Sequence, residues 1–318
     1  MEFWHFKRLS FTLAGILLLV AGLMPINALA AQTPSVQNLN LASVHAAVVD
    51  LDSGEKLHEK YADTAVPIAS LTKIMTALVI LESDQPLDEY ITIVERHRPT
   101  PVNAYSRIRI GSEAKREDLV RIALMASENL AAHVLARHYP GGFDAFINAM
   151  NDKAQSLGMS NTRFVDPAGL SSDNRASASD MARLLAAAWK HEKIRELSTT
   201  RYFGIWFQNP RYELRYGNTN VLVHRNRWDL ELTKTGYLDA AGRCLMMATT
   251  VDGRTLGMVF LDSFGKRTPL GDAGRVRRWI ETGNSGAVAG AARRYEREQV
   301  QALNSAGNTE HALTDNSQ

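Results

Sequence analysis

A serine hydroxyl and a lysine amine lie one helical turn apart in the segment Ser70-Leu71-Thr72-Lys73. Residues i and i+3 share one face of a helix, so the amine of Lys73 can reach the oxygen of Ser70. A serine hydroxyl is a weak nucleophile and needs a base within hydrogen-bond distance. Lysine is such a base only when it is neutral, and we expect burial and the cation of Lys234 to lower the pKa of Lys73. The pair alone does not define a site, because a helix cap beside a solvated lysine has the same spacing.

Two further polar tripeptides have apolar neighbours. Ser127–Asn129 (Ser-Glu-Asn) interrupts a helical stretch, where a hydroxyl can relay a proton and an amide can hold a substrate amide. Lys234–Gly236 (Lys-Thr-Gly) follows strand residues, where a cation and a hydroxyl can bind a carboxylate and glycine admits an extended substrate. Each tripeptide alone is more typical of a polar helix patch or a strand end. The three motifs in this order predict one serine acyl-transfer site.

Hydrophobic periodicity predicts the elements that position these motifs. A buried strand at 45–51, a turn at 52–54 and a second strand at 56–61 form a hairpin, and apolar residues at i, i+3 and i+4 indicate a core helix over 70–82. The middle, 83–200, is mostly helical, with helices expected in 117–138 and 143–157 and a third after the capping box of Ser177 and Asp180. Strands at 231–235, 244–251 and 254–261 and a helix at 271–281 follow. One sheet assembled from both chain ends, with the helical part inserted, is therefore expected.

Composition bounds the class of protein. Of 318 residues, 45% are hydrophobic and 22% charged, which is ordinary for a globular chain and argues against disorder as the main state. The formal net charge of +2 gives no reason to expect nucleic-acid binding. The single cysteine, Cys244, excludes an intramolecular disulfide and a cysteine zinc cluster, and its apolar surroundings predict burial.

The chain ends predict export and a polar tail. Residues 1–30 have a signal peptide's features: Lys7 and Arg8, an apolar run over 11–24 that is shorter than the about 20 residues of a membrane span, and small residues before a cleavage site near Ala30. Residues 31–41 are expected to be a linker and 42–282 the catalytic domain. Residues 283–318 are polar and are expected to form a disordered tail.

The motif set Ser-x-x-Lys, Ser-x-Asn and Lys-Thr-Gly resembles the signature of the penicillin-recognising serine hydrolases. The segments 67–69 (Pro-Ile-Ala), 166–170 (Asp-Pro-Ala-Gly-Leu) and 239–242 (Asp-Ala-Ala-Gly) are similar to those of low-molecular-mass penicillin-binding proteins, over about residues 40–282. The Ser-Glu-Asn motif and the absence of an evident further domain resemble the D-alanyl-D-alanine endopeptidase branch. The resemblance implies an α/β (α+β) fold like that of β-lactamases and transpeptidases. Its five-stranded antiparallel sheet would be flanked by helices with an inserted helical subdomain.

The resemblance also implies roles for the motif residues. Ser70 is the expected nucleophile, Lys73 the general base and Ser127 the proton relay to the leaving amine. The expected substrate-binding groups are the side chains or backbone of Asn129, Lys234, Thr235, Gly236 and Tyr237, with the backbone N–H groups of Ser70 and Tyr237 forming an oxyanion hole. No metal or cofactor is implied. The role of Glu128, the acidic centre of the second motif, is left open.

The function implied is a periplasmic endopeptidase that hydrolyses D-alanyl-diaminopimelate cross-links of peptidoglycan, with β-lactams as covalent inhibitors and at most peripheral membrane contact. A carboxypeptidase acting on pentapeptide stems is the alternative. A β-lactamase of class A type would use a glutamate after the second motif, yet no Glu occurs between Asn129 and His191, and Asp166 before Pro167 is typical of a turn. A metallopeptidase would need metal ligands at close spacing, such as a His-Glu-x-x-His motif, and this sequence has no such motif. A non-catalytic wall-binding protein would not need three complete motifs.

Overall fold

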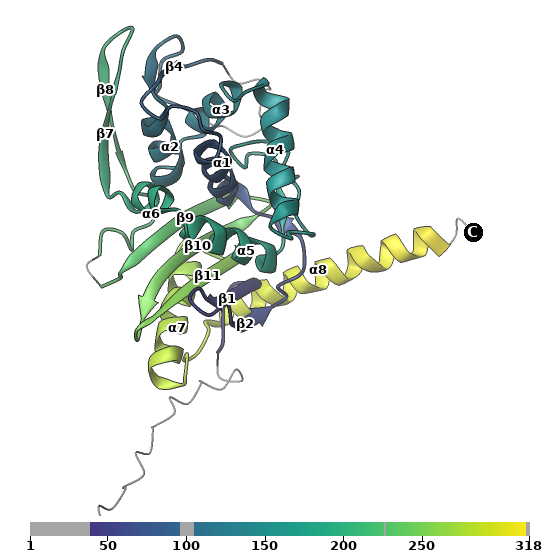
Figure 1. Cartoon of the computed structure of the whole chain (residues 1–318). Helices are drawn as coiled ribbons and strands as arrows, with labels where there is room; N and C mark the ends of the chain where they lie inside the picture. Colours follow the sequence, from purple (N-terminus) through teal and green to yellow (C-terminus); the bar gives the residue numbers. More distant parts are fainter. Residues whose placement is uncertain (1–38, 96–104, 226, 316–318) are drawn as a thin grey trace, which may run out of the picture. The chain divides into compact units, whose positions relative to one another are not determined.

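A five-stranded antiparallel sheet joins the two ends of the described chain (Figure 1). The computed structural model describes residues 39–95, 105–225 and 227–315, so the expected signal peptide lies outside the described residues. The strand order is β2-β1-β11-β10-β9, with β1 paired to β11 from His45 opposite Leu261. The strands are β1 His45–Asp50, β2 Lys56–Lys60, β9 Leu230–Leu238, β10 Gly242–Val251 and β11 Arg254–Ser263. The predicted fold class and sheet are confirmed.

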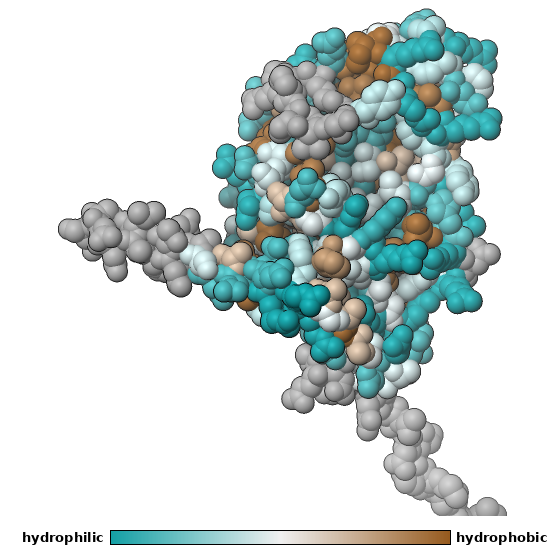
Figure 2. All heavy atoms as spheres, turned by 180° about the vertical axis from the view of Figure 1, so that it is seen from behind, coloured by the Kyte–Doolittle hydropathy of each residue, from teal (hydrophilic) through white to brown (hydrophobic). Residues whose placement is uncertain are grey.

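Alternating side chains bury both faces of this sheet. On β10, Met246 and Ala248 join the core shared with the helices that follow β2, whereas Leu245 and Met247 join the core shared with α7 (Thr268–Thr282). Successive strand residues point to opposite faces, so a strand covered on both sides is apolar throughout. This is why 244–251 is a continuous apolar run. The face of the molecule that Figure 2 shows is largely hydrophilic, with scattered hydrophobic patches.

In the described part of the chain, six helices form the layer on one face of the sheet, and this layer carries two of the three motifs. They are α1 Thr72–Leu81, α2 Arg116–Met125, α3 Asn129–Arg137, α4 Gly142–Ser156, α5 Ala178–Trp189 and α6 Glu192–Thr199. Helix α1 follows a 3-10 turn, η2 (Ala69–Leu71), so the regular helix begins two residues later than Ser70. Ser177 is the N-cap of α5, since its hydroxyl accepts from the Asp180 N–H, whereas the Asp180 carboxylate accepts from Asn161 and Thr162, so one of the two capping-box hydrogen bonds is observed.

Among the described residues, three two-stranded ribbons lie outside the main sheet. They are β3 (Val66–Pro67) with β6 (Arg175–Ala176), β4 (Tyr90–Thr92) with β5 (Glu113–Lys115), and β7 (Tyr202–Phe207) with β8 (Tyr212–Gly217). The ribbons were not predicted, because strands of two or three residues carry too few side chains for a periodic pattern, and the β7–β8 hairpin has aromatic residues on both faces.

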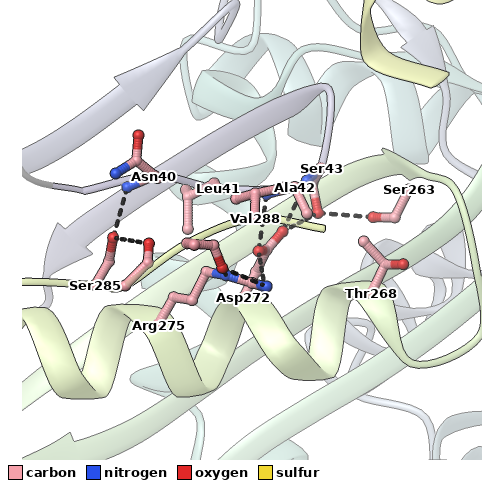
Figure 3. A network of polar contacts seen from close by, with 12 residues as sticks. Asn40, Leu41, Ala42, Ser43, Ser263, Thr268, Asp272, Arg275, Ser285 and Val288 are labelled. Atoms are coloured by element: carbon pink, nitrogen blue, oxygen red, sulfur yellow. Dashed lines mark hydrogen bonds and ion pairs between the residues drawn. The ribbon is translucent and has the colours of Figure 1, made fainter. Parts of the chain in front are cut away.

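A buried carboxylate fixes the start of the described chain against α7 (Figure 3). Asp272 is fully buried and accepts from the backbone N–H groups of Ala42 at 2.9 Å and Ser43 at 2.7 Å, and it forms an ion pair with Arg275. Nearby, the Asn40 N–H donates to the Ser285 hydroxyl at 2.8 Å. The folded domain therefore extends beyond the expected limits of 42 and 282 at both ends.

The expected disordered tail differs from the structure, which has a helix, α8, over Gly290–Asp315. Its first turns are rich in Ala, Arg, Glu and Gln, which are strong helix formers although they are polar. Tyr295 donates a hydrogen bond to Asp262 of β11, and Glu296 pairs with Lys60 of β2 at 2.9 Å. Among the helices in the described part of the chain, none is both long and apolar enough to cross a membrane.

Candidate active site

The predicted nucleophile lies in the tight turn before α1. Ala69 has a φ of +47°, and the Thr72 hydroxyl donates to its carbonyl at 2.8 Å. Two glycines bring neighbouring segments against this turn. A Cβ on Gly169 would lie 1.9 Å from the Ala69 carbonyl oxygen, and a Cβ on Gly236 would lie 3.2 Å from the Ser70 nitrogen. A side chain is therefore excluded at position 169 and would be tightly constrained at position 236, where the third motif lies beside the Ser70 N–H.

Lys73 contacts the hydroxyl that it would activate. Its Nζ donates to Ser70 Oγ at 2.9 Å, to Asn129 Oδ1 at 2.8 Å and to the Ala168 carbonyl at 2.6 Å. The side chain is fully buried, and this burial lowers the pKa of Lys73 to about 7, although the negative charges of Asp166 and Glu128 act in the opposite direction. A substantial fraction of the amine is therefore neutral near neutral pH, as a base requires.

The second lysine binds the second motif. Lys234 Nζ donates to Ser127 Oγ at 3.0 Å and to the Thr235 carbonyl at 2.8 Å, and the side chain is buried. Burial, and then the charge of Lys73, hold the pKa of Lys234 well below its usual value. The sequence predicts that both burial and Lys234 lower the pKa of Lys73, and only the effect of burial is found. Burial is the leading cause at Lys73, and the repulsion between the two cations acts on Lys234.

The second motif forms the break between α2 and α3. Ser127 has a φ of +60°, which ends the first helix and directs its hydroxyl toward Lys234. Glu128 is the N-cap of α3, where its Oε1 accepts from the Leu130 N–H at 3.1 Å, and its Oε2 accepts from Tyr216 Oη at 3.4 Å. The role that the sequence left open is therefore partly structural, since Glu128 caps the helix that starts at Asn129.

A loop at 166–171 supplies a ligand of Lys73 that has no side-chain signal. The Asp166 carboxylate accepts from the N–H groups of Ala168 and Gly169, each at 2.7 Å, and from two more in the same loop. This turn, predicted from the Asp-Pro pair, directs the Ala168 carbonyl at Lys73. Buried Asn174 holds the loop by donating to the Asp166 carbonyl at 2.9 Å and to Thr72 Oγ1 at 3.1 Å. Sequence reasoning missed Asn174 and the Ala168 carbonyl.

The three motifs meet in a cavity of about 540 Å³. All the predicted site residues line it or lie beneath it: Ser70, Ser127, Asn129, Thr235, Gly236 and Tyr237 form its wall, and Lys73 and Lys234 are buried behind them.

Sequence reasoning missed several other residues of the cavity wall. Thr219 lies 2.7 Å from Thr235, hydroxyl to hydroxyl, and the Arg243 guanidinium lies 3.5 Å from the centroid of the Tyr237 ring. Arg243 and Lys266 are the charged groups of the wall, and both are basic, which suits an anionic substrate.

Comparison with known proteins identifies the family. A Ser–Lys pair at the junction of an antiparallel sheet and a helical layer defines the penicillin-recognising class of serine enzymes. The chain belongs to the D-alanyl-D-alanine carboxypeptidase family, whose profile matches residues 30–265, and it is a serine D-alanyl-D-alanine peptidase. A D-alanyl-D-alanine endopeptidase of Escherichia coli is 46% identical over 269 residues, which cover 85% of this chain and 87% of the relative.

Solved structures agree with this assignment. The crystal structure of a Streptomyces DD-transpeptidase has a TM-score of 0.70 and 25% identity, covering 77% of this chain and 98% of that chain. A penicillin-binding protein of Listeria monocytogenes, solved in its cefotaxime-bound form, has a TM-score of 0.65 and 28% identity, covering 76% of this chain and 98% of that chain. Within the described ranges, no group of three or more His, Cys, Asp or Glu residues could hold a metal ion.

Proposed function

We propose that this peptidase is a periplasmic endopeptidase that hydrolyses the D-alanyl-diaminopimelate cross-links of peptidoglycan through an acyl-enzyme on Ser70. The observation that carries the proposal is the 2.9 Å contact between Ser70 Oγ and the buried amine of Lys73, whose pKa is about 7. The 46% identity to a protein named D-alanyl-D-alanine endopeptidase supports the cross-link as substrate.

The reaction follows from these contacts. Ser70 Oγ attacks the D-alanyl carbonyl carbon while neutral Lys73 takes the hydroxyl proton, and the backbone N–H groups of Ser70 and Tyr237 stabilise the oxyanion. The Ser127 hydroxyl, bonded to Lys234, relays a proton to the departing amine as the C–N bond breaks. Asn129 holds the peptide backbone, and Lys234 with Thr235 binds the substrate carboxylate. Water then hydrolyses the ester and regenerates Ser70.

The alternative is a carboxypeptidase that releases terminal D-alanine from pentapeptide stems, which the name of the matching family favours. Both reactions use the same attack and differ in the leaving amine. A cavity of about 540 Å³ with two basic wall residues has room for a leaving group larger than one D-alanine, and this supports the cross-link.

A β-lactamase activity is disfavoured by the bonding of Asp166. Both of its carboxylate oxygens accept backbone N–H groups of the loop, so this carboxylate is committed to the turn rather than to a hydrolytic water. We therefore expect β-lactams to acylate Ser70 and to be released slowly. The cefotaxime complex of the Listeria protein, with the same fold, is consistent with covalent inhibition. The export signal proposed for residues 1–30 would deliver the enzyme to the periplasm.

Two assays test the proposal. Purified cross-linked muropeptide dimers and pentapeptide monomers are digested side by side, with Ser70→Ala as the control that removes the nucleophile. We expect the wild type to cleave dimers and the variant to cleave neither substrate. Release of D-alanine from pentapeptides with dimers left intact would establish the carboxypeptidase instead. Mass spectrometry after penicillin treatment should find the adduct on the Ser70 peptide, and an adduct on another serine would refute the assigned nucleophile.

A further inference from the structure

The β7–β8 hairpin exposes aromatic side chains on the face that does not pack on the core. Tyr202 is 74% and Trp206 52% exposed, whereas Ile205 and Phe207, on the opposite face of the same strand, are fully buried. Figure 1 shows the hairpin as the outermost element on one side of the helical layer. Apolar burial therefore explains one face of the hairpin, whereas Tyr202 and Trp206 on the other face remain mostly exposed.

Two glycines make this outward face flat. Gly217 pairs with Tyr202 across the strands, and a Cβ on Gly217 would lie 3.5 Å from carbons of the Tyr202 ring. Gly204 follows two residues later, and a Cβ there would lie 2.4 Å from the Glu213 carboxylate. The Tyr202 ring and the Glu213 side chain thus lie over glycine backbone. The Tyr202 ring also contacts the His224 ring, with the two centroids 4.9 Å apart, and it is still mostly exposed, so much of its surface is available for stacking.

Polar groups separate the two aromatic residues. Glu213 faces Trp206 across the strands and pairs with Arg215 at 3.2 Å, and the Arg211 guanidinium lies 4.9 Å from the Trp206 ring centroid. Four residues along a strand span about 14 Å at ~3.4 Å per residue, so the aromatic side chains stand about that far apart. We call Tyr202, Trp206, Glu213 and Arg215 the hairpin face. It alternates an aromatic ring, an ion pair and a second aromatic ring.

The hairpin is continuous with the active-site cavity. Thr219 and Val221, which line the cavity, follow directly after β8, and the Thr219 N–H donates to the Met125 carbonyl at 2.9 Å. Tyr216, on β8, donates to Glu128 of the second motif. A polymer whose peptide branch entered the cavity could therefore continue along the hairpin.

We propose that the hairpin face binds the sugar strand of the peptidoglycan whose cross-link enters the cavity; this inference rests on the proposed function for its choice of polymer. A pyranose ring presents apolar C–H groups on its faces and hydroxyls around its edge. Flat aromatic rings match the faces, and the carboxylate and guanidinium of Glu213 and Arg215 match the hydroxyls.

The position of the Glu213 carboxylate, at the centre of the hairpin face, favours this occupant over a nucleic acid. Arg211 and Arg215 outnumber Glu213 on the outer part of the hairpin, so the carboxylates of peptide stems are attracted. A phosphate chain would have to run past the Glu213 carboxylate at the centre of the face. Glycan contacts outside the cavity would hold the enzyme on the polymer and raise the local concentration of cross-links without changing the chemical step.

The test compares a polymer with its soluble fragment. The double variant Tyr202→Ala/Trp206→Ala is assayed on intact insoluble sacculi and on soluble muropeptide dimers, and its binding to peptide-free glycan strands is measured by titration calorimetry. We expect cleavage of sacculi and glycan binding to fall about tenfold, from the typical loss on truncating two interface aromatic residues, with dimer cleavage unchanged. The control is Tyr90→Ala, an exposed aromatic residue beside Lys115 on another ribbon, which should behave as wild type.

Each outcome separates this inference from the proposed function. Equal loss on sacculi and dimers, or unchanged glycan binding by the double variant, would overturn the inference, as would tighter binding of a single-stranded oligonucleotide than of glycan. If the wild type cleaves no dimers, the endopeptidase proposal fails, and the glycan titration still tests the hairpin face. Tyr202→Phe/Trp206→Phe keeps the rings and should restore glycan binding. The acylation rate with a fluorescent penicillin shows whether each variant is folded.

Discussion

The protonation of Lys73 predicts how acylation depends on pH. The amine is neutral above its pKa of about 7 and charged below it, so the base is present at alkaline pH and is lost as pH falls. About one tenth of the enzyme has a neutral Lys73 at about pH 6 and about one hundredth at about pH 5. Acylation by penicillin should therefore fall about tenfold per pH unit below about pH 7 and be constant above it.

Glu128→Gln gives the matched perturbation. The Glu128 charge raises the pKa of Lys73, and a glutamine oxygen can still accept from the Leu130 N–H and so keep the cap of α3. Removing the charge should lower the pKa of Lys73. The variant should then acylate faster than wild type at about pH 6 and equally fast on the alkaline plateau.

Stopped-flow acylation with a fluorescent penicillin from about pH 5 to about pH 9 measures both profiles. Lys73→Arg, which stays charged throughout this range, should lose orders of magnitude at every pH while remaining folded. A flat wild-type profile down to about pH 5, or a Glu128→Gln profile displaced to higher pH, would refute the reasoning. Equal acylation rates of wild type and Glu128→Gln at alkaline pH would show that the substitution has not moved the Ser127 hydroxyl or the Asn129 amide.

Three further predictions concern the support of the site. Gly169→Ala should slow acylation at least about tenfold, because the added Cβ would collide with the Ala69 carbonyl. The control is Gly253→Ala, which also has a positive φ but has open space around its Cβ and should lose only about 1 kcal/mol of stability. Equal melting temperatures and equal acylation rates for the two variants would contradict this. Asn174→Ala removes the acceptor of two partly buried N–H groups, those of Val165 and Asp166, and should lower the free energy of unfolding in urea by about 2 kcal/mol; a loss under about 1 kcal/mol would contradict this. Tyr295→Phe should speed hydrogen exchange in the first turns of α8 without altering acylation, and unchanged exchange would show that its hydroxyl does not hold the helix.

Local sequence determined the sheet and the chemical groups of the site. The runs at 45–51, 244–251 and 254–261 are apolar and bounded by turn residues, which favours buried strands, and the ends of each run lie within two residues of the ends of β1, β10 or β11. The spacing of Ser70 and Lys73 is a local property of one helical turn. Their 2.9 Å contact was therefore predictable without any long-range information.

Tertiary structure decided how those groups are supported and how basic they are. The Ala168 carbonyl carries no side-chain signal, and its contact with Lys73 joins residues 95 positions apart. The lowered pKa of Lys73 depends on burial by several elements, which no single segment encodes. The same reason applies to α8, whose polar composition predicted a disordered tail. Tyr295 and Glu296 contact residues of β11 and β2, and these two strands come together only when the sheet has formed. Residue types and short spacings are properties of the sequence, whereas burial and long-range contacts exist only in the folded chain.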